Sequence, residues 1–344
     1  MSKAKIDLSE YRGTFVQKKY IDEDDELINS FNISFLRDNN RSQIQEMILF
    51  LSKKKIILPN LINEQLEFSF EYKDIVKFQR FKMSFLPVGT GIEYRNWAAG
   101  EINLVQFANW GREKLINSIK ELQPEYTLPP QEEITEEEKW YNAACALFIA
   151  TNKGNLEIYG GFPIIEEVKF EYKNALKKWW RITDKTSAEN KISWLLTQGH
   201  RVEFVKKITE LSKCTYGIND NTKLKIEKIC KTYKVSEKDA LDLLTIYDYY
   251  NEFGETAIDG WDYVRAINLI SQCYLAGYFE KEEALEKSKE IAILVKTKFS
   301  SWEALINSYL FGCEFKNKNT AKNRRKQFYD IKSKPNNIFD TKWD

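Results

Sequence analysis

The chain contains a single histidine, His200. Zinc sites built on two or three histidines, HExxH proteases and histidine-ligated di-iron centres are therefore excluded, and only carboxylate-based metal sites stay open. No metal ion or other cofactor is predicted. A catalytic triad has no basis either, because no suitable serine or cysteine lies near His200 in the sequence.

Cysteine is scarce and scattered. The five cysteines occur singly, without a CxxC pair. This pattern gives neither a disulfide framework nor a cysteine-rich zinc site. We expect buried free thiols.

The chain also lacks an excess of charge of one sign and lacks long apolar runs. Lys and Arg total 52 and Asp and Glu total 51, which leaves a formal charge of +1. A polyanion site would therefore have to be local. No segment approaches the roughly 20 apolar residues of a membrane span, and the first residues lack the apolar core of a signal peptide. We expect a cytoplasmic protein without membrane contact.

What the chain does contain is ample apolar material, with 43% hydrophobic and 14% aromatic residues. The predicted fold class is α+β, with a mixed α/β N-terminal domain over residues 1–125. Apolar spacing predicts helices over residues 42–53 and 101–122. Strict alternation predicts a strand over residues 66–73, and Phe81, Met83 and Phe85 repeat that pattern. Gly89-Thr90-Gly91 is interpreted as a hairpin or strand-end turn, not a phosphate-binding loop.

A junction rich in proline and glutamate covers residues 126–138 and precedes a predicted helical domain over residues 139–315. Thr135 with Glu138 has the spacing of a capping box. The same start signal is assigned to Thr186 with Glu189 and to Ser300 with Glu303, and a weaker one to Ser236 with Asp239. Six or seven helices are expected, with Gly277 closing the helix that begins near Ile258.

Residues 316–344 are strongly basic. They hold nine basic and three acidic side chains, a net charge of +6. We rank a solvated basic tail ahead of a tail that folds back on the acidic body or binds a polyanion. Arg324, Arg325 and Lys326, beside Phe328 and Tyr329, are a weak nucleic-acid candidate.

A polar stripe runs along the expected helix 258–276. Asp262, Arg265, Asn268 and Gln272 fall within an arc of about 120° on an otherwise apolar helix. The preferred interpretation makes Asp262 and Arg265 an internal ion-paired strut. In the functional alternative Asp262 is a base or metal ligand in a cleft, and Arg265 binds an anion.

Other candidates lie upstream and downstream. Gly199 is predicted to end a short helix, followed by His200 and Arg201. His200 is interpreted as a hydrogen-bonded residue at a helix end, with catalysis as the alternative. Trp261 and Trp302 are interpreted as core residues, with a ligand-binding aromatic cage as the alternative.

One set of sequence blocks resembles a known family. The segment from Ala257 to Leu269, Gly277-Tyr278, Ser300-Ser301-Trp302 and Tyr309-Leu310-Phe311-Gly312 resemble the bacterial family called domain of unknown function 1266. Trp179 to Ile182 and Gly199-His200-Arg201 resemble its earlier blocks. The resemblance covers about residues 140–315. The family pattern prefers Arg and Trp where this chain has Cys313 and Phe315.

Two functional hypotheses remain. The resemblance implies an immunity or accessory role, because some family members are encoded near polymorphic-toxin loci; this favours a non-enzymatic factor that binds a protein partner, such as a cognate toxin. The alternative is a hydrolase acting on a phosphate-containing substrate, with Asp262, Arg265, His200 and Arg201 converging in one cleft. We prefer the binding protein, because the sequence lacks a catalytic signature.

Overall fold

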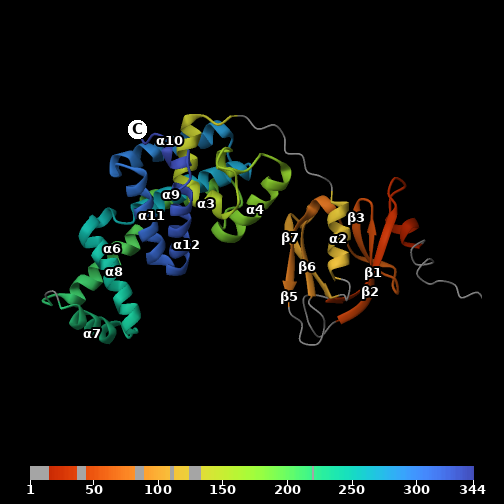
Figure 1. The fold of residues 1–344 in the computed structure, drawn as a ribbon, viewed down its shortest axis with the longest axis horizontal. Coiled ribbons are helices and arrows are strands. Elements are labelled where there is room, and N and C mark those ends of the chain that lie inside the picture. Colours follow the sequence, from red (N-terminus) through yellow and green to blue (C-terminus); the bar gives the residue numbers. More distant parts are fainter. Residues whose placement is uncertain (1–14, 37–43, 82–88, 109–111, 124–132, 219–220) are drawn as a thin grey trace, which may run out of the picture. The chain divides into compact units, whose positions relative to one another are not determined.

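The computed structural model describes residues 15–36, 44–81, 89–108, 112–123, 133–218 and 221–344. The chain divides into two compact units, Met1–Leu128 and Pro129–Asp344 (Figure 1). An antiparallel sheet forms the first unit and helices form the second, which confirms the α+β class. None of the described helices is long and apolar enough to cross a membrane.

The first unit is a seven-stranded sheet in the order β4-β3-β2-β1-β7-β6-β5. The strands are β1 (Leu27–Leu36), β2 (Ile44–Ser52), β3 (Lys55–Asn60), β4 (Gln65–Glu71), β5 (Ile75–Phe81), β6 (Gly89–Asn96) and β7 (Glu101–Ala108). Phe70 of β4 stacks on Tyr94 of β6 at 4.0 Å between ring centroids, so the sheet curls on itself. Helix α2 (Arg112–Leu122) adds Leu115 and Ile119 to the sheet core.

Of two helix predictions in this unit, one is wrong and the other is confirmed only in its second half. Residues 42–53 hold strand β2, whose Leu49 and Leu51 face the main sheet core while Phe50 faces a second core with Val16. A strand buried on both faces loses its polar alternation and therefore imitates a helical period. Residues 101–122 divide between strand β7 and helix α2.

Other predictions in this unit have mixed outcomes. Strand β4 confirms the alternation over residues 66–71, whereas Tyr72 and Lys73 lie in a short 3-10 helix. Gly89 to Gly91 is not a turn but the start of β6, and it pairs with β5 and β7. Met83 and Phe85 lie outside the described residues.

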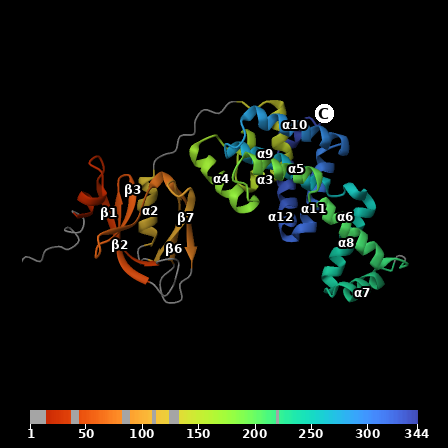
Figure 2. The same cartoon turned by 180° about the vertical axis from the view of Figure 1, so that it is seen from behind.

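The helical unit surrounds one central helix, α9 (Asp259–Leu275), which packs against α3, α4, α5, α10 and α11 (Figures 1 and 2). The remaining helices are α3 (Glu136–Thr151), α4 (Glu166–Trp180), α5 (Lys185–Thr197), α6 (Arg201–Thr215), α7 (Thr222–Tyr233), α8 (Glu237–Phe253), α10 (Lys281–Lys298), α11 (Trp302–Lys316) and α12 (Lys318–Lys332). Nine described α-helices, α3 to α11, thus cover residues 136–316, more than the six or seven expected. Helices α6, α7 and α8 form a smaller apolar cluster of their own.

Helix boundaries test the capping predictions. The Thr135–Glu138 capping box, the Ser236 cap and the Gly277 terminus are confirmed. Helix α5 instead begins after Asp184, which forms a box with Ser187, and α11 begins after Ser301. The predictions at Thr186 and Ser300 are therefore wrong by two residues and by one residue.

The basic C-terminal segment is not a solvated tail. Helix α12 buries Ala321, Phe328 and Ile331 against the helical core, and Ile338 joins the same cluster. Charge counting missed these apolar residues because they recur at helical spacing between the lysines and arginines. The segment is part of the helical unit.

The cysteines are free thiols, as expected. Cys145, Cys273 and Cys313 are buried, whereas Cys214 and Cys230 are partly exposed. Burial raises the pKa of the Cys313 thiol to about 11. The buried thiols therefore serve as small apolar residues.

The α3 capping box makes stability depend on pH. Glu138 is 1% exposed; burial alone would raise the pKa of its carboxyl, but Lys281 at 2.8 Å and the Thr135 amide hold that pKa below the usual 4.5. A lowered pKa means that this stabilisation is complete above pH 4.5 and is lost as the pH falls further. We expect Glu138→Gln to cost about 2 kcal/mol at neutral pH and progressively less as the pH falls below 4.5, measured by urea unfolding.

The matched control is Glu136→Gln in the same helical turn. Its carboxylate pairs with Lys139 but its side chain is 78% exposed. This variant should cost well under about 1 kcal/mol at every pH, since exposed ion pairs contribute little. Equal effects of the two variants would contradict the prediction.

Candidate functional site

The tight turn between α5 and α6 forms one side of the candidate site. Gly199 adopts a left-handed φ of +60° and its amide donates to the carbonyl of Trp194, which ends α5 as predicted. A Cβ at Gly199 would lie 2.1 Å from the Asp262 carboxylate. Only glycine lets the turn approach α9 this closely.

Asp262 closes the N-terminus of α6. Its carboxylate accepts the His200 amide at 2.9 Å and the Arg201 amide at 3.1 Å, and the Arg201 guanidinium lies 3.7 Å away. The side chain is fully buried. A carboxylate at a helix N-terminus accepts hydrogen bonds from backbone amides that otherwise lack partners. Its negative charge also interacts favourably with the positive end of the helix dipole. Asp262 thus ties α9 to the α5–α6 turn.

Arg265 lies one helical turn further along α9, between two indole rings. Its guanidinium carbon is 4.7 Å from the Trp180 ring centroid and 4.8 Å from that of Trp261. Nη1 lies 2.8 Å from Nδ1 of His200. Burial lowers the pKa of Arg265, and the charge of Asp262 partly opposes this shift. The side chain nevertheless stays partly exposed.

His200 joins the two halves of the site. Its Nδ1 faces Arg265 and also accepts the indole N–H of Trp261 at 3.3 Å, while Trp194 packs edge-on at 5.3 Å. Guanidinium and indole groups only donate, so Nδ1 can accept from both, and it also lies 3.4 Å from Oδ1 of Asp262. The ring is a link in the network, and its Nδ1 is occupied.

The structure therefore brings together His200, Arg201, Trp261, Asp262 and Arg265. Arg201 also donates to the Leu196 carbonyl and lies over the Tyr263 ring at 5.1 Å. We name three partly exposed residues of this cluster, together with the two tryptophans that contact Arg265 and His200, the indole–arginine face. It consists of Trp180, Trp194, His200, Trp261 and Arg265.

The remaining candidates lie elsewhere. Asn268 is buried further along α9, and Gln272 is partly exposed near the end of that helix. Trp302 packs against Trp140 and Trp343, and its indole donates to the Thr341 carbonyl at 2.8 Å. Trp302 thus contributes to holding the end of the described chain on the core.

The arginine–lysine cluster of α12 is largely neutralised within the protein. Arg324 donates to Thr151 and the Leu147 carbonyl and lies over the Phe148 ring. Arg325 pairs with Glu314 at 2.7 Å, and Lys326 pairs with Asp330 at 2.6 Å. A phosphate would have to compete with these carboxylates, which weakens the case for nucleic-acid binding here.

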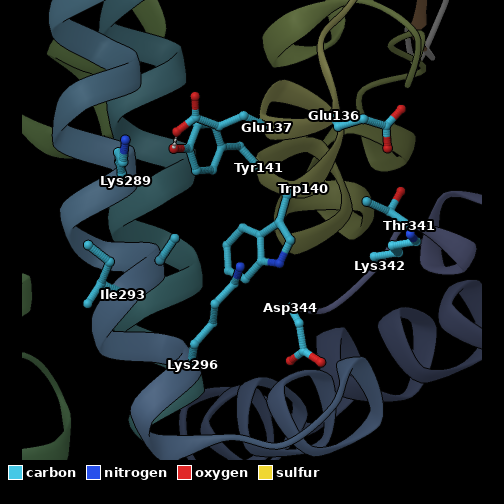
Figure 3. A pocket seen from close by; sticks show the side chains of 11 residues that line it. Glu136, Glu137, Trp140, Tyr141, Lys289, Ile293, Lys296, Thr341, Lys342 and Asp344 are labelled. Carbon is cyan, nitrogen blue, oxygen red and sulfur yellow. Dashed lines mark hydrogen bonds between the residues drawn. The ribbon is translucent and has the colours of Figure 1, made fainter.

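A cavity of about 470 Å³ was not anticipated from the sequence (Figure 3). Trp140 forms part of its wall, and Lys296 places its ammonium group 5.2 Å from that ring centroid. Glu137 accepts the Tyr141 hydroxyl at 2.7 Å. Three lysines and three acidic residues line the cavity together, so its lining has no net preference for one sign of charge.

Comparisons with known proteins agree with the resemblance seen in the sequence. A family model described as "Protein of unknown function (DUF1266)" matches residues 175–343. The match ends beyond residue 315, so it takes in the C-terminal segment, whereas the resemblance was assigned to about residues 140–315. At the departures from the family pattern, Cys313 is buried and Phe315 packs on Phe204 at 5.5 Å.

No curated protein matches the chain. Among solved structures, the C-terminal domain of an unknown protein from Leishmania infantum is 16% identical, with a TM-score of 0.26, over 33% of this chain and 97% of that one. So low a score carries no argument about fold or activity. The whole indole–arginine face lies within residues 175–343, the part of the chain that is similar to the family of unknown function 1266.

Proposed function

We propose that this protein is a non-enzymatic binding protein that docks a partner protein on the indole–arginine face. One observation carries the proposal: a partly exposed arginine, Arg265, lies between two partly exposed tryptophans. Tryptophan and arginine are enriched among the residues that contribute most to protein–protein binding energy. Trp179, the residue before Trp180 in α4, is 75% exposed and is a second candidate contact for the partner.

The chemistry of Arg265 indicates what the partner presents. The guanidinium carbon lies 4.7 and 4.8 Å from the Trp180 and Trp261 ring centroids, and its Nη1 lies 2.8 Å from Nδ1 of His200. Further N–H donors remain for an outside acceptor, and a carboxylate is the acceptor that guanidinium binds best. We therefore propose that an acidic side chain of the partner meets Arg265, surrounded by apolar contacts to the tryptophans.

The test is affinity purification from the native source, followed by calorimetry with the retained protein. Arg265→Gln should weaken binding about 30-fold or more, the effect of losing about 2 kcal/mol at a central contact. Trp179→Ala, an exposed substitution, should weaken binding without altering the fold. Lys289→Gln, which removes the same charge at the cavity of Figure 3, should leave the affinity unchanged.

Failure to retain any protein partner would count against the proposal. So would a partner whose affinity is indifferent to both Arg265→Gln and Trp179→Ala. The finer proposal is that the partner is a toxin and that this protein is its cytoplasmic immunity or accessory factor. Co-expression should then abolish the toxicity, and the Arg265→Gln variant should restore it.

The alternative proposal is a hydrolase for a phosphate-containing substrate. The convergence of Asp262, Arg265, His200 and Arg201 favours it. Two observations oppose it: the Asp262 side chain has no exposed surface, and the His200 Nδ1 already accepts hydrogen bonds. A general base must reach the proton that it removes. Hydrolysis of a phosphate ester that disappears in Asp262→Asn, with the fold intact, would favour the hydrolase.

A further inference from the structure

Helix α7 presents a lysine-rich outer surface. Lys223, Lys225, Lys228, Lys231 and Lys234 occupy this segment, with Glu227 as its one acidic residue, so residues 222–234 carry a net charge of 5 − 1 = +4. Four of the lysines are exposed and Lys225 is partly exposed. We name these five residues the α7 lysine face.

The helix fixes these lysines on the side away from its core. Ile229 is fully buried, and Ile226 and Tyr233 pack with it against α6 and α8. At 100° per residue, the lysines spread over the opposite arc of about 200°. Both views place α7 at the end of the helical unit, remote from α9 (Figures 1 and 2). The lysine face is thus exposed at this end of the helical unit.

These lysines differ from several other lysines of the helical unit. Within the part of the chain that the structure describes, no carboxylate forms an ion pair with any of the five. By contrast, lysines of α10 to α12 are paired with carboxylates: Lys298–Asp259, Lys316–Glu203, Lys318–Asp242, Lys326–Asp330 and Lys332–Glu303. Among the described residues, five lysines without an ion pair therefore lie together on one short helix, α7, and the turn that ends it.

We infer that the α7 lysine face binds the phosphate backbone of a nucleic acid without reading its sequence. Lysine supplies mobile point charges that suit repeated phosphates, and neutralising several phosphates releases counterions. An anionic membrane suits the face less well, because interfacial helices bury a broad apolar face. On the exposed side of α7 only Leu224 is a large apolar residue, with Tyr216 on the preceding turn.

The experiment uses the full chain and fluorescein-labelled duplex DNA of mixed sequence, followed by fluorescence anisotropy at several salt concentrations. With five phosphate contacts, log K should fall against log salt with a slope of about −4.5. That slope corresponds to an affinity loss of about 500-fold between 50 and 200 mM salt. Changing all five lysines to glutamine should remove most of the slope and weaken binding at least about tenfold.

A matched control removes the same five charges elsewhere on the helical unit. It changes exposed lysines outside α7 to glutamine: Lys153, Lys173, Lys289, Lys322 and Lys334. This variant should bind within about twofold of the original chain, because screening limits the reach of distant charges. All ten substitutions are on the surface, so both variants should fold.

Three results would overturn the inference. One is equal loss of affinity in both variants, which would indicate attraction by total charge alone. Another is binding to vesicles of anionic phospholipid but not to DNA. The last is no anisotropy change with DNA at low salt. The partner-protein experiment above is independent of all three, because the indole–arginine face contains none of the lysines changed here.

Discussion

Replacing Asp262 with alanine should lower the free energy of unfolding of the helical unit by about 3–5 kcal/mol. In the unmodified protein the His200 and Arg201 amides lie 2.9 and 3.1 Å from the Asp262 carboxylate. The substitution leaves both amides without an acceptor at the start of α6. It also leaves the partly buried Arg201 guanidinium without its nearby carboxylate. Urea unfolding followed by circular dichroism at 222 nm in the α-helical band provides the measurement.

Asp242→Ala is the matched control for this prediction. Asp242 pairs with Lys318 at the surface, and its side chain is 27% exposed. Removing it should cost under about 1 kcal/mol, as for other exposed pairs. If Asp262→Ala cost no more than Asp242→Ala, the role of Asp262 as the link between α9 and the α5–α6 turn would be refuted.

Capping residues predict helix termini well where no neighbouring residue could cap the helix equally well. Thr135 with Glu138 and the glycine at position 277 act as the sequence indicates. At Ser300 the neighbouring Ser301 has the same hydroxyl, and its side chain accepts the Ala304 amide instead. Choosing between equivalent neighbours requires tertiary contacts, which a single sequence does not display.

Burial on both faces explains the errors in the sheet. The apolar residues of β2 serve two cores, so the strand carries no alternation from which a period of two could be recognised. The prediction of a solvated C-terminal tail is wrong for the opposite reason. The sparse apolar residues of this segment, Phe328 and Ile331 among them, are diluted by charge, yet they suffice to hold α12 on the core.

The candidate site was predictable in part. The polar stripe correctly identified Asp262 and Arg265 as residues with partners inside the protein, and the structural interpretation of Asp262 agrees with its amide contacts. Instead of the expected direct ion pair with Asp262, Arg265 contacts the ring of His200. The backbone amide of His200 in turn donates to Asp262. The tryptophan on the other side of Arg265, Trp180, was not predictable, because no periodicity relates α4 to α9 across 85 positions.

The close packing of α9 against α11 at Trp261 gives the second prediction of a large loss of stability. Helices α9 and α11 approach so closely that a Cβ at Gly312 would lie 2.2 Å from the Cβ of Trp261. Gly260 makes the corresponding approach, 2.6 Å from the Leu305 carbonyl oxygen. We expect Gly312→Ala to destabilise the helical unit by about 3 kcal/mol, because the two helices must separate to admit one methyl group.

The same substitution should disturb the indole–arginine face. Trp261 both covers Arg265 and donates to His200, so moving its backbone should change the tryptophan fluorescence of the native state and weaken partner binding. Gly217→Ala is the control, because Gly217 has a φ of +75° but no atom within 4 Å of its Cβ position. It should cost only the about 1–2 kcal/mol of backbone strain and leave the fluorescence unchanged. Identical fluorescence in both variants would show that close packing at Gly312 does not position Trp261, and the indole–arginine face would then depend on other contacts.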